Sequence, residues 1–101
     1  MRIAIVDDLP GERALLKARL EKALARCSVQ ADYFEYESGE AFLAAAKAAP
    51  FAVALLDIYM PGINGVETAK ALRAFDPACL LIFTTTSTDH ALAGFQVRAM
   101  H

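Results

Sequence analysis

The sequence predicts an α/β domain in which a parallel β-sheet is covered by helices on both faces. Residues 3–6, 51–56 and 79–83 form short, continuously apolar runs, which are typical of strands buried on both sides. Residues 32–37 form a fourth strand-like run. A segment with helical character follows each run, and strict alternation of strands and helices is the pattern of a parallel sheet with right-handed crossovers.

The first two helices are predicted from periodicity and end signals. Leucines recur every four residues within residues 12–26, which places an apolar stripe on one side of that helix. Ser38 is a suitable N-cap for a second, Ala-rich helix that continues to residue 49, before Pro50.

The remaining elements have equally local signals. Asn64 is expected to cap a third helix that ends near residue 75, with Glu67 reaching back to the cap. A fourth helix is expected over residues 88–100. Acidic and aromatic residues alternate in residues 32–37, which indicates a half-exposed strand at an edge of the sheet.

Composition limits the classes of function. A chain of 101 residues suits one domain, and a net charge of −2 does not indicate a surface for nucleic acid or anionic membranes. No apolar run approaches the roughly 20 residues of a membrane span. The N-terminus has no targeting segment, so we expect a cytoplasmic protein. Cys27 and Cys79 lie far apart without a CxxC partner and are expected to be free, buried thiols.

Polar residues follow three of the predicted strands. Asp7 and Asp8 end the first, Asp57 ends the third, and Thr84 and Thr85 end the fourth. The carboxyl ends of parallel strands lie on one edge of a sheet, where ligands bind at the reversal of strand order. Carboxylates gathered there should have raised pKa values, and a hard cation such as Mg²⁺ would remove the repulsion. The alternative is that each acid only caps the helix after its strand.

The sequence does not predict an enzyme with a substrate pocket. It has no Gly-rich phosphate loop and no Ser-His-Asp set. A phosphatase with Asp57 as its nucleophile would need a second acid two residues later, where Tyr59 stands. A lone carboxylate nucleophile beside Mg²⁺ suits phosphoryl transfer, in which catalysis is mainly positioning and charge neutralisation.

At this point the chain resembles the receiver domain of bacterial two-component response regulators. Residues 3–8 are similar to the family's first strand with its acidic pair. Residues 57–65 match its phosphorylation segment, D-x-x-M-P-x-x-x-G, and residues 82–86 are similar to its fourth strand with a switch hydroxyl. The resemblance covers the whole chain, residues 1–101, as one receiver domain that is incomplete at its C-terminus.

The resemblance implies a role for each matching acid. Asp57 would be the phosphoacceptor. Asp7 and Asp8 would hold Mg²⁺ together with Asp57 and the backbone carbonyl of Tyr59. The protein would assist only its own phosphorylation and dephosphorylation.

The resemblance also assigns the neighbouring loop and the switch. Thr85 matches the switch hydroxyl, and Thr84 is the second candidate. Met60 and Pro61 would shape the loop after the third strand, and Gly65 would let the third helix pack closely.

The implied fold is flavodoxin-like, with strand order 2-1-3-4-5. This chain supplies four strands and four helices, and strand five and helix five are missing. The family's lysine after strand five, which pairs with the phosphoryl group, has no match either. Strand four would then be an exposed edge, and two copies would associate through strand four and helix four. The alternative function is a receiver-fold interaction module that does not switch.

The partner implied by the resemblance is a sensor histidine kinase. Residues 34–40 and 89–99 further resemble receivers of the LytTR class, which precede a DNA-binding domain. DNA would therefore be bound only through an output domain outside this chain, in transcription control, and no membrane partner is expected.

Overall fold

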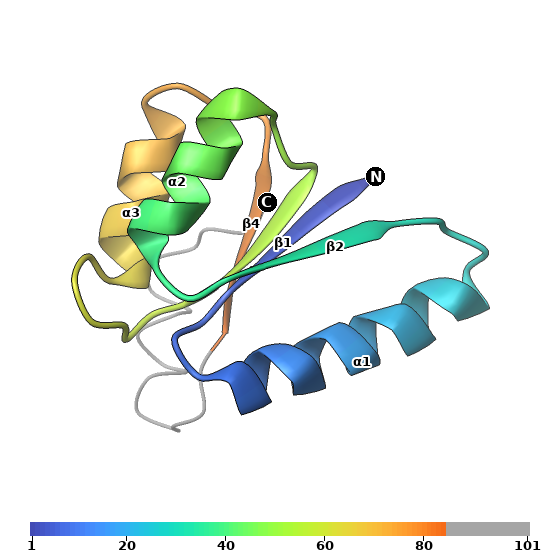
Figure 1. Cartoon of the computed structure of the whole chain (residues 1–101). Helices are drawn as coiled ribbons and strands as arrows, with labels where there is room; N and C mark the ends of the chain where they lie inside the picture. The colour runs from blue at the N-terminus through green and yellow to red at the C-terminus, as the bar shows by residue number, and fades with distance from the viewer. Residues whose placement is uncertain (85–101) are drawn as a thin grey trace.

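The computed structural model describes residues 1–84, and these form an open α/β sheet (Figure 1). The predicted fourth helix and Thr85 lie outside the described residues. The elements in chain order are β1 (Arg2–Val6), α1 (Pro10–Arg26), β2 (Asp32–Tyr36), α2 (Gly39–Ala48), β3 (Val53–Asp57), α3 (Gly65–Arg73) and β4 (Leu80–Thr84).

The sheet has the predicted topology. Its strand order is β2-β1-β3-β4, and every neighbouring pair is parallel. The chain therefore runs from β1 to β2 on one side and returns to β3 on the other. This reversal places the carboxyl ends of β1 and β3 side by side at the point where doubly wound sheets bind ligands.

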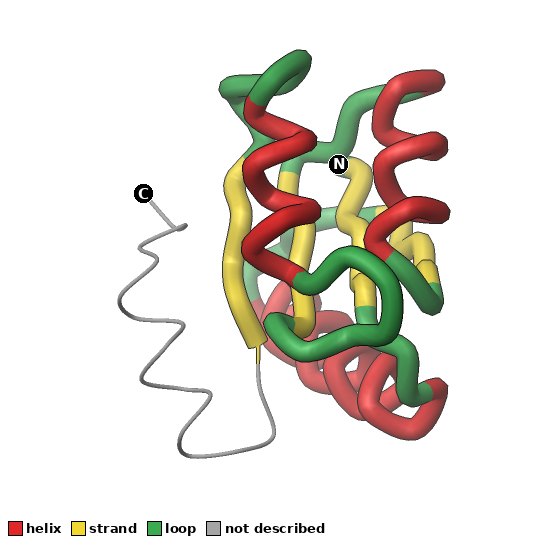
Figure 2. The backbone as a smooth tube through the Cα atoms, turned by 90° about the vertical axis from the view of Figure 1, so that its left-hand side faces the viewer, coloured by secondary structure: helices red, strands yellow, loops and turns green. Residues whose placement is uncertain are grey.

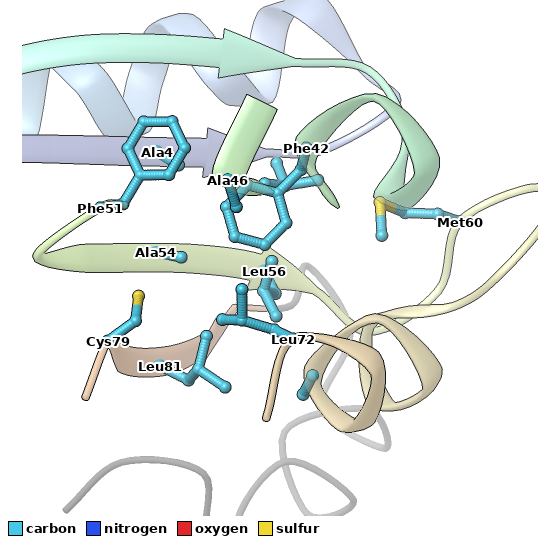
Figure 3. Close-up of a cluster of buried hydrophobic side chains, with 12 residues drawn as sticks. Ala4, Phe42, Ala46, Phe51, Ala54, Leu56, Met60, Leu72, Cys79 and Leu81 are labelled. Atoms are coloured by element: carbon cyan, nitrogen blue, oxygen red, sulfur yellow. The ribbon is translucent and has the colours of Figure 1, made fainter. Parts of the chain in front are cut away.

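Helices cover both faces of the sheet. α1 lies on one face, and α2 and α3 lie together on the opposite face (Figures 1 and 2). Between the sheet and these two helices, side chains from α2, β3, α3 and β4 pack together. They include Phe42, Leu56, Leu72 and Leu81 (Figure 3). These four side chains are at most 1% exposed, so they form a closed core.

The α1 face has a smaller buried cluster, made of Ile3, Ile5 and Leu55. The leucine stripe of α1 packs against this cluster, as its spacing predicts, but no residue of α1 is itself fully buried. α1 is therefore attached to the sheet by partial burial along its length and by polar contacts of Arg13 in its first turn.

The predicted helix caps are confirmed. The Ser38 hydroxyl accepts a hydrogen bond from the Ala41 amide at 3.1 Å. Asn64 and Glu67 form a reciprocal capping box, with hydrogen bonds of 2.8 and 3.0 Å. These contacts span only three residues, which explains why local sequence predicted them.

Three local predictions were wrong. α1 begins at Pro10 and not at residue 12. Proline is favourable at the first helical position, because the N–H that it lacks would have no hydrogen-bond partner within the helix there. β3 begins at Val53, while Phe51 is buried against the rings of Phe34 and Phe42 rather than lying in the strand. Cys27 is exposed at the C-terminus of α1, whereas Cys79 is buried as expected.

Among residues 1–84, none of the helices has both the length and the apolar composition that a membrane crossing requires.

Candidate functional site

Three carboxylates meet at the carboxyl ends of β1 and β3, as the sequence predicted. Asp7 and Asp8 directly follow β1, and Asp57 is the last residue of β3. One oxygen from each carboxylate lies within 4.8 Å of the others. Val6 and Leu56 are paired in the parallel register, so the next residues, Asp7 and Asp57, leave the sheet side by side.

Asp57 is strongly perturbed by this arrangement. Its pKa is raised from 3.8 to about 6, first because burial removes water from the carboxylate and then because Asp7 and Asp8 repel its charge. Hydrogen bonds from the backbone amides of Tyr59 and Ile58 act in the opposite direction and lower the pKa. Asp57 is thus a carboxylate held in place by its own loop but destabilised by its neighbours.

Asp7 is the most deeply buried of the three acids, at 3% exposed. Its pKa is also raised, again chiefly by burial, while a hydrogen bond from the Leu9 amide to Oδ1, 2.9 Å long, lowers it. The Asp7 amide donates to the Tyr36 carbonyl at 3.1 Å, which ties the residue to β2. The acid is therefore rigidly placed beside Asp57.

This donor set fits Mg²⁺. Hard divalent cations take carboxylate oxygens, and Mg²⁺ is normally held by a few of them with water and phosphate filling its other positions. Bringing three carboxylates within 4.8 Å, one of them buried, is unfavourable unless protons or a cation balance their charge. Asp7, Asp8 and Asp57 are the residues that would hold the ion.

The loop between β3 and α3 is fixed against the site. The Gly65 amide donates to the Ile58 carbonyl at 2.8 Å, and a Cβ at Gly65 would collide with the Asp57 carbonyl oxygen. Only glycine permits this close approach of the α3 N-terminus to the acid. The expected close packing at Gly65 is therefore present.

The other loop residues take different environments. Met60 is buried among the core side chains, and Pro61 is exposed (Figure 3). The Tyr59 side chain is 50% exposed beside the site. A buried Met60 anchors the loop to the core, and the role of Met60 and Pro61 in shaping the loop stays a prediction.

The N-terminus of α2 supports the same loop, and the sequence did not predict this. A Cβ at Gly39 would collide with the Thr68 hydroxyl and the Ile63 side chain, so α2 and α3 touch at this point. Glu40 Oε2 accepts a long, 3.4 Å hydrogen bond from the Ile63 amide. Gly62, with φ +78°, lies against the same carboxylate.

Of the two candidate switch hydroxyls, Thr84 is the one within the described residues. It is paired with Asp57 in the β3–β4 register. Its Oγ1 is buried and has no hydrogen-bond partner among residues 1–84. The assignment of Thr85 stays a prediction.

Arg13 is a second contact that sequence reasoning missed. From the first turn of α1, its Nη1 donates to the Asp7 carbonyl at 2.7 Å, and its Nε pairs with Glu35 Oε1 on β2 at 3.2 Å. Local sequence does not indicate either partner, because Glu35 is 22 residues away and Asp7 is 6 residues away, across the loop before α1.

The sheet topology and the acids at its switch point are those expected of a receiver domain. The family model described as the response regulator receiver domain matches residues 3–101. The chain belongs to this family.

Curated relatives contain this domain within longer chains. The positive alginate biosynthesis regulatory protein of Pseudomonas aeruginosa is 32% identical over 99% of this chain and 39% of its own length. The virulence sensor protein BvgS of Bordetella bronchiseptica is 37% identical over 88% of this chain and 7% of its own length. The sensory transduction protein LytT of Oceanobacillus iheyensis is 43% identical over 46% of this chain and 20% of its own length. The chain thus spans less than half the length of each of these relatives.

Solved structures have the same fold. The response regulator TrrA of Thermotoga maritima, in complex with Mg²⁺ and a beryllium fluoride, superimposes with a TM-score of 0.75. It is 31% identical, and the match covers 88% of this chain and 72% of that one. The chemotaxis protein CheY4 of Vibrio cholerae has a TM-score of 0.74 and 26% identity, over 98% of this chain and 81% of that one.

Proposed function

We propose that this chain is a signalling switch that takes up a phosphoryl group on Asp57 with the help of Mg²⁺. The observation that carries the proposal is the meeting of Asp7, Asp8 and Asp57 oxygens within 4.8 Å at the switch point of the sheet. If each acid only capped the helix after its strand, the three carboxylates would not need to lie close together, because each would act on its own helix.

Asp57 is the nucleophile of the proposed reaction. One of its oxygens forms a bond to the phosphorus of a phosphohistidine or an acyl phosphate. The bond from phosphorus to the donor breaks, and the donor leaves with that electron pair. With a pKa of about 6, Asp57 is mostly ionised at pH 7.5 and is able to attack. When bound, Mg²⁺ would neutralise charge on the phosphoryl oxygens.

The remaining residues of the site orient Asp57 and transmit its modification. The Ile58 and Tyr59 amides hold the carboxylate, Gly65 holds the loop against it, and the Tyr59 carbonyl is the proposed additional oxygen ligand. A phosphoryl group on Asp57 adds oxygens that attract the Thr85 hydroxyl. That attraction shifts the population of a binding surface, without a released product.

The proposed setting is a cytoplasmic two-component pathway in which a sensor histidine kinase is the phosphoryl donor. Similarity to the alginate regulator and to LytT supports a receiver of the LytTR class. In that class the output is transcription control through a DNA-binding domain outside these residues. Association of two copies through β4 and the predicted fourth helix belongs to the same proposal.

The alternative is a receiver-fold interaction module that does not switch. Such a module would use the same fold as a constant binding surface.

Chemical phosphorylation tests the proposal directly. The protein is incubated with acetyl phosphate or carbamoyl phosphate and Mg²⁺, and its intact mass is measured. We expect a gain of one phosphoryl group that peptide mapping places on Asp57, and no gain for Asp57→Asn or in EDTA. Binding of Mg²⁺ without any gain in mass would favour the interaction module instead.

A further inference from the structure

Arg13 joins three parts of the molecule beside the acidic site. Its guanidinium donates from Nη1 to the backbone carbonyl of Asp7 at 2.7 Å and from Nε to Glu35 Oε1 at 3.2 Å. The Arg13 side chain is 16% exposed and that of Glu35 is 36% exposed. The contact with the Asp7 carbonyl is partly buried, whereas the pair with Glu35 lies at the surface.

These contacts complete the fixation of Asp7. Its amide is held by the Tyr36 carbonyl, its carboxylate by the Leu9 amide, and its carbonyl by Arg13. The carbonyl of Asp7 belongs to the planar peptide bond between Asp7 and Asp8. Fixing that plane sets the direction in which the chain delivers Asp8 as well.

The way Arg13 is bonded leaves the acids available for a cation. A guanidinium near three carboxylates would normally form a bidentate pair with one of them. Here it contacts the carbonyl of Asp7, and the carboxylate that it pairs with is Glu35, outside the cluster. Glu35 also balances the positive charge of Arg13, which would otherwise repel a divalent cation.

We propose that Arg13, held by Glu35, is a positioning residue for the Mg²⁺ site formed by Asp7, Asp8 and Asp57. The inference rests on the proposed function, because it concerns the same site. Residues that orient metal ligands through hydrogen bonds affect metal affinity about 10–100-fold when they are removed. The role is thus measurable in the affinity for Mg²⁺ alone, without any phosphoryl transfer.

The position and the charge of Arg13 should have opposite effects on the affinity for Mg²⁺, so a substitution distinguishes them. If Arg13 acted only through its charge, Arg13→Gln would tighten Mg²⁺ binding, because a cation near the site is removed. If it only attached α1 to the sheet, the variant would lower the melting temperature and leave the Mg²⁺ affinity of the folded protein unchanged. The positioning role alone predicts weaker binding of Mg²⁺.

The experiment is a calorimetric titration of the full chain with MgCl₂. We expect Arg13→Gln to raise the Kd about tenfold or more, and Arg19→Gln, on an exposed part of the same helix, to leave it unchanged. Arg13→Lys keeps the charge but cannot make both contacts from one planar group, so its Kd is expected to rise too. An unchanged or lowered Kd in Arg13→Gln overturns the inference.

Glu35→Gln keeps an oxygen acceptor for Arg13 but removes the balancing charge. We expect it to raise the Kd severalfold in the wild-type background and to have no effect in the Arg13→Gln background, since Glu35 acts through Arg13. If Arg13→Gln does not fold, Arg13→Lys and Glu35→Gln decide the question, and an unchanged Kd in both refutes it. Absence of Mg²⁺ binding in the wild-type protein would instead refute the proposed function.

Discussion

Removing the charge of Asp57 should stabilise the metal-free protein, and the structure allows the size of this effect to be worked out. The perturbation is Asp57→Asn, which keeps the shape of the side chain and an oxygen for the Ile58 and Tyr59 amides. The carboxylate is partly buried beside Asp7 and Asp8, and the asparagine has no charge to be desolvated or repelled.

The sign follows from the direction of the pKa shift. The pKa of Asp57 is raised from 3.8 to about 6 in the folded protein, so the folded state binds the proton more tightly than the unfolded chain. Stability contributed by this proton is full below pH 3.8 and is lost as the pH rises through about 6. About 2 pKa units at 1.36 kcal/mol each set an upper value of about 3 kcal/mol. Because solvent screens part of this interaction, we expect Asp57→Asn to gain about 1–2 kcal/mol at pH 8.

Urea unfolding followed by far-UV circular dichroism measures this gain. The free energy of unfolding is compared for wild type and Asp57→Asn in EDTA at pH 8 and at pH 4, where the gain should largely disappear. Asp32→Asn is the matched control, because Asp32 is exposed on β2, and its effect should stay within about 0.5 kcal/mol. Mg²⁺ at ten times its Kd should then add about 1.4 kcal/mol to wild type.

The reasoning would be refuted if Asp57→Asn were no more stable than wild type at pH 8, or if its gain were the same at pH 4. Either result would mean that burial and the neighbouring acids do not raise the pKa of Asp57 in the folded protein.

Three further predictions concern the loop, the metal site and a cap. Gly65→Ala should destabilise the protein by about 2–4 kcal/mol in thermal unfolding, because its Cβ would collide with the Asp57 carbonyl oxygen. Gly11→Ala, with nothing within 4 Å, should instead stabilise by about 0.5–1 kcal/mol, and equal effects would contradict the packing argument. The affinity for Mg²⁺ should fall about tenfold between pH 8 and pH 5, because the ion competes with a proton on Asp57 whose pKa is about 6; a flat calorimetric pH profile would count against this. Asn64→Ala should lose about 1 kcal/mol in urea unfolding through the broken capping box, whereas exposed Lys70→Ala should change little.

Local sequence determined the elements and the composition of the site. Continuously apolar runs predicted buried parallel strands, and alternation in residues 32–37 predicted an edge strand, which β2 is. The caps at Ser38 and Asn64 depend on contacts three residues apart, so their sequence signals were sufficient. The convergence of the acids also followed from sequence, because strict alternation of strands and helices brings the strand ends to one edge.

Burial and long-range contacts were decided only by the tertiary structure. Phe51 looked like the start of a strand because it is apolar, but it packs against rings from β2 and α2. An apolar run indicates burial and does not distinguish a strand from a core residue beside one. The exposure of Cys27 likewise depends on where α1 ends relative to the sheet.

For the acidic site too, some features followed from the sequence and others were decided only by the tertiary structure. Sequence alone determined that Asp7, Asp8 and Asp57 belong to one site, because their positions follow from the order of the strands. The raised pKa of Asp57 was expected in direction, but its extent depends on how much water the folded loop excludes. The contacts of Arg13 with Asp7 and Glu35 arise only when α1 packs across β1 and β2. They join residues 6 and 22 positions apart, and neither spacing is a periodic pattern that a sequence would display.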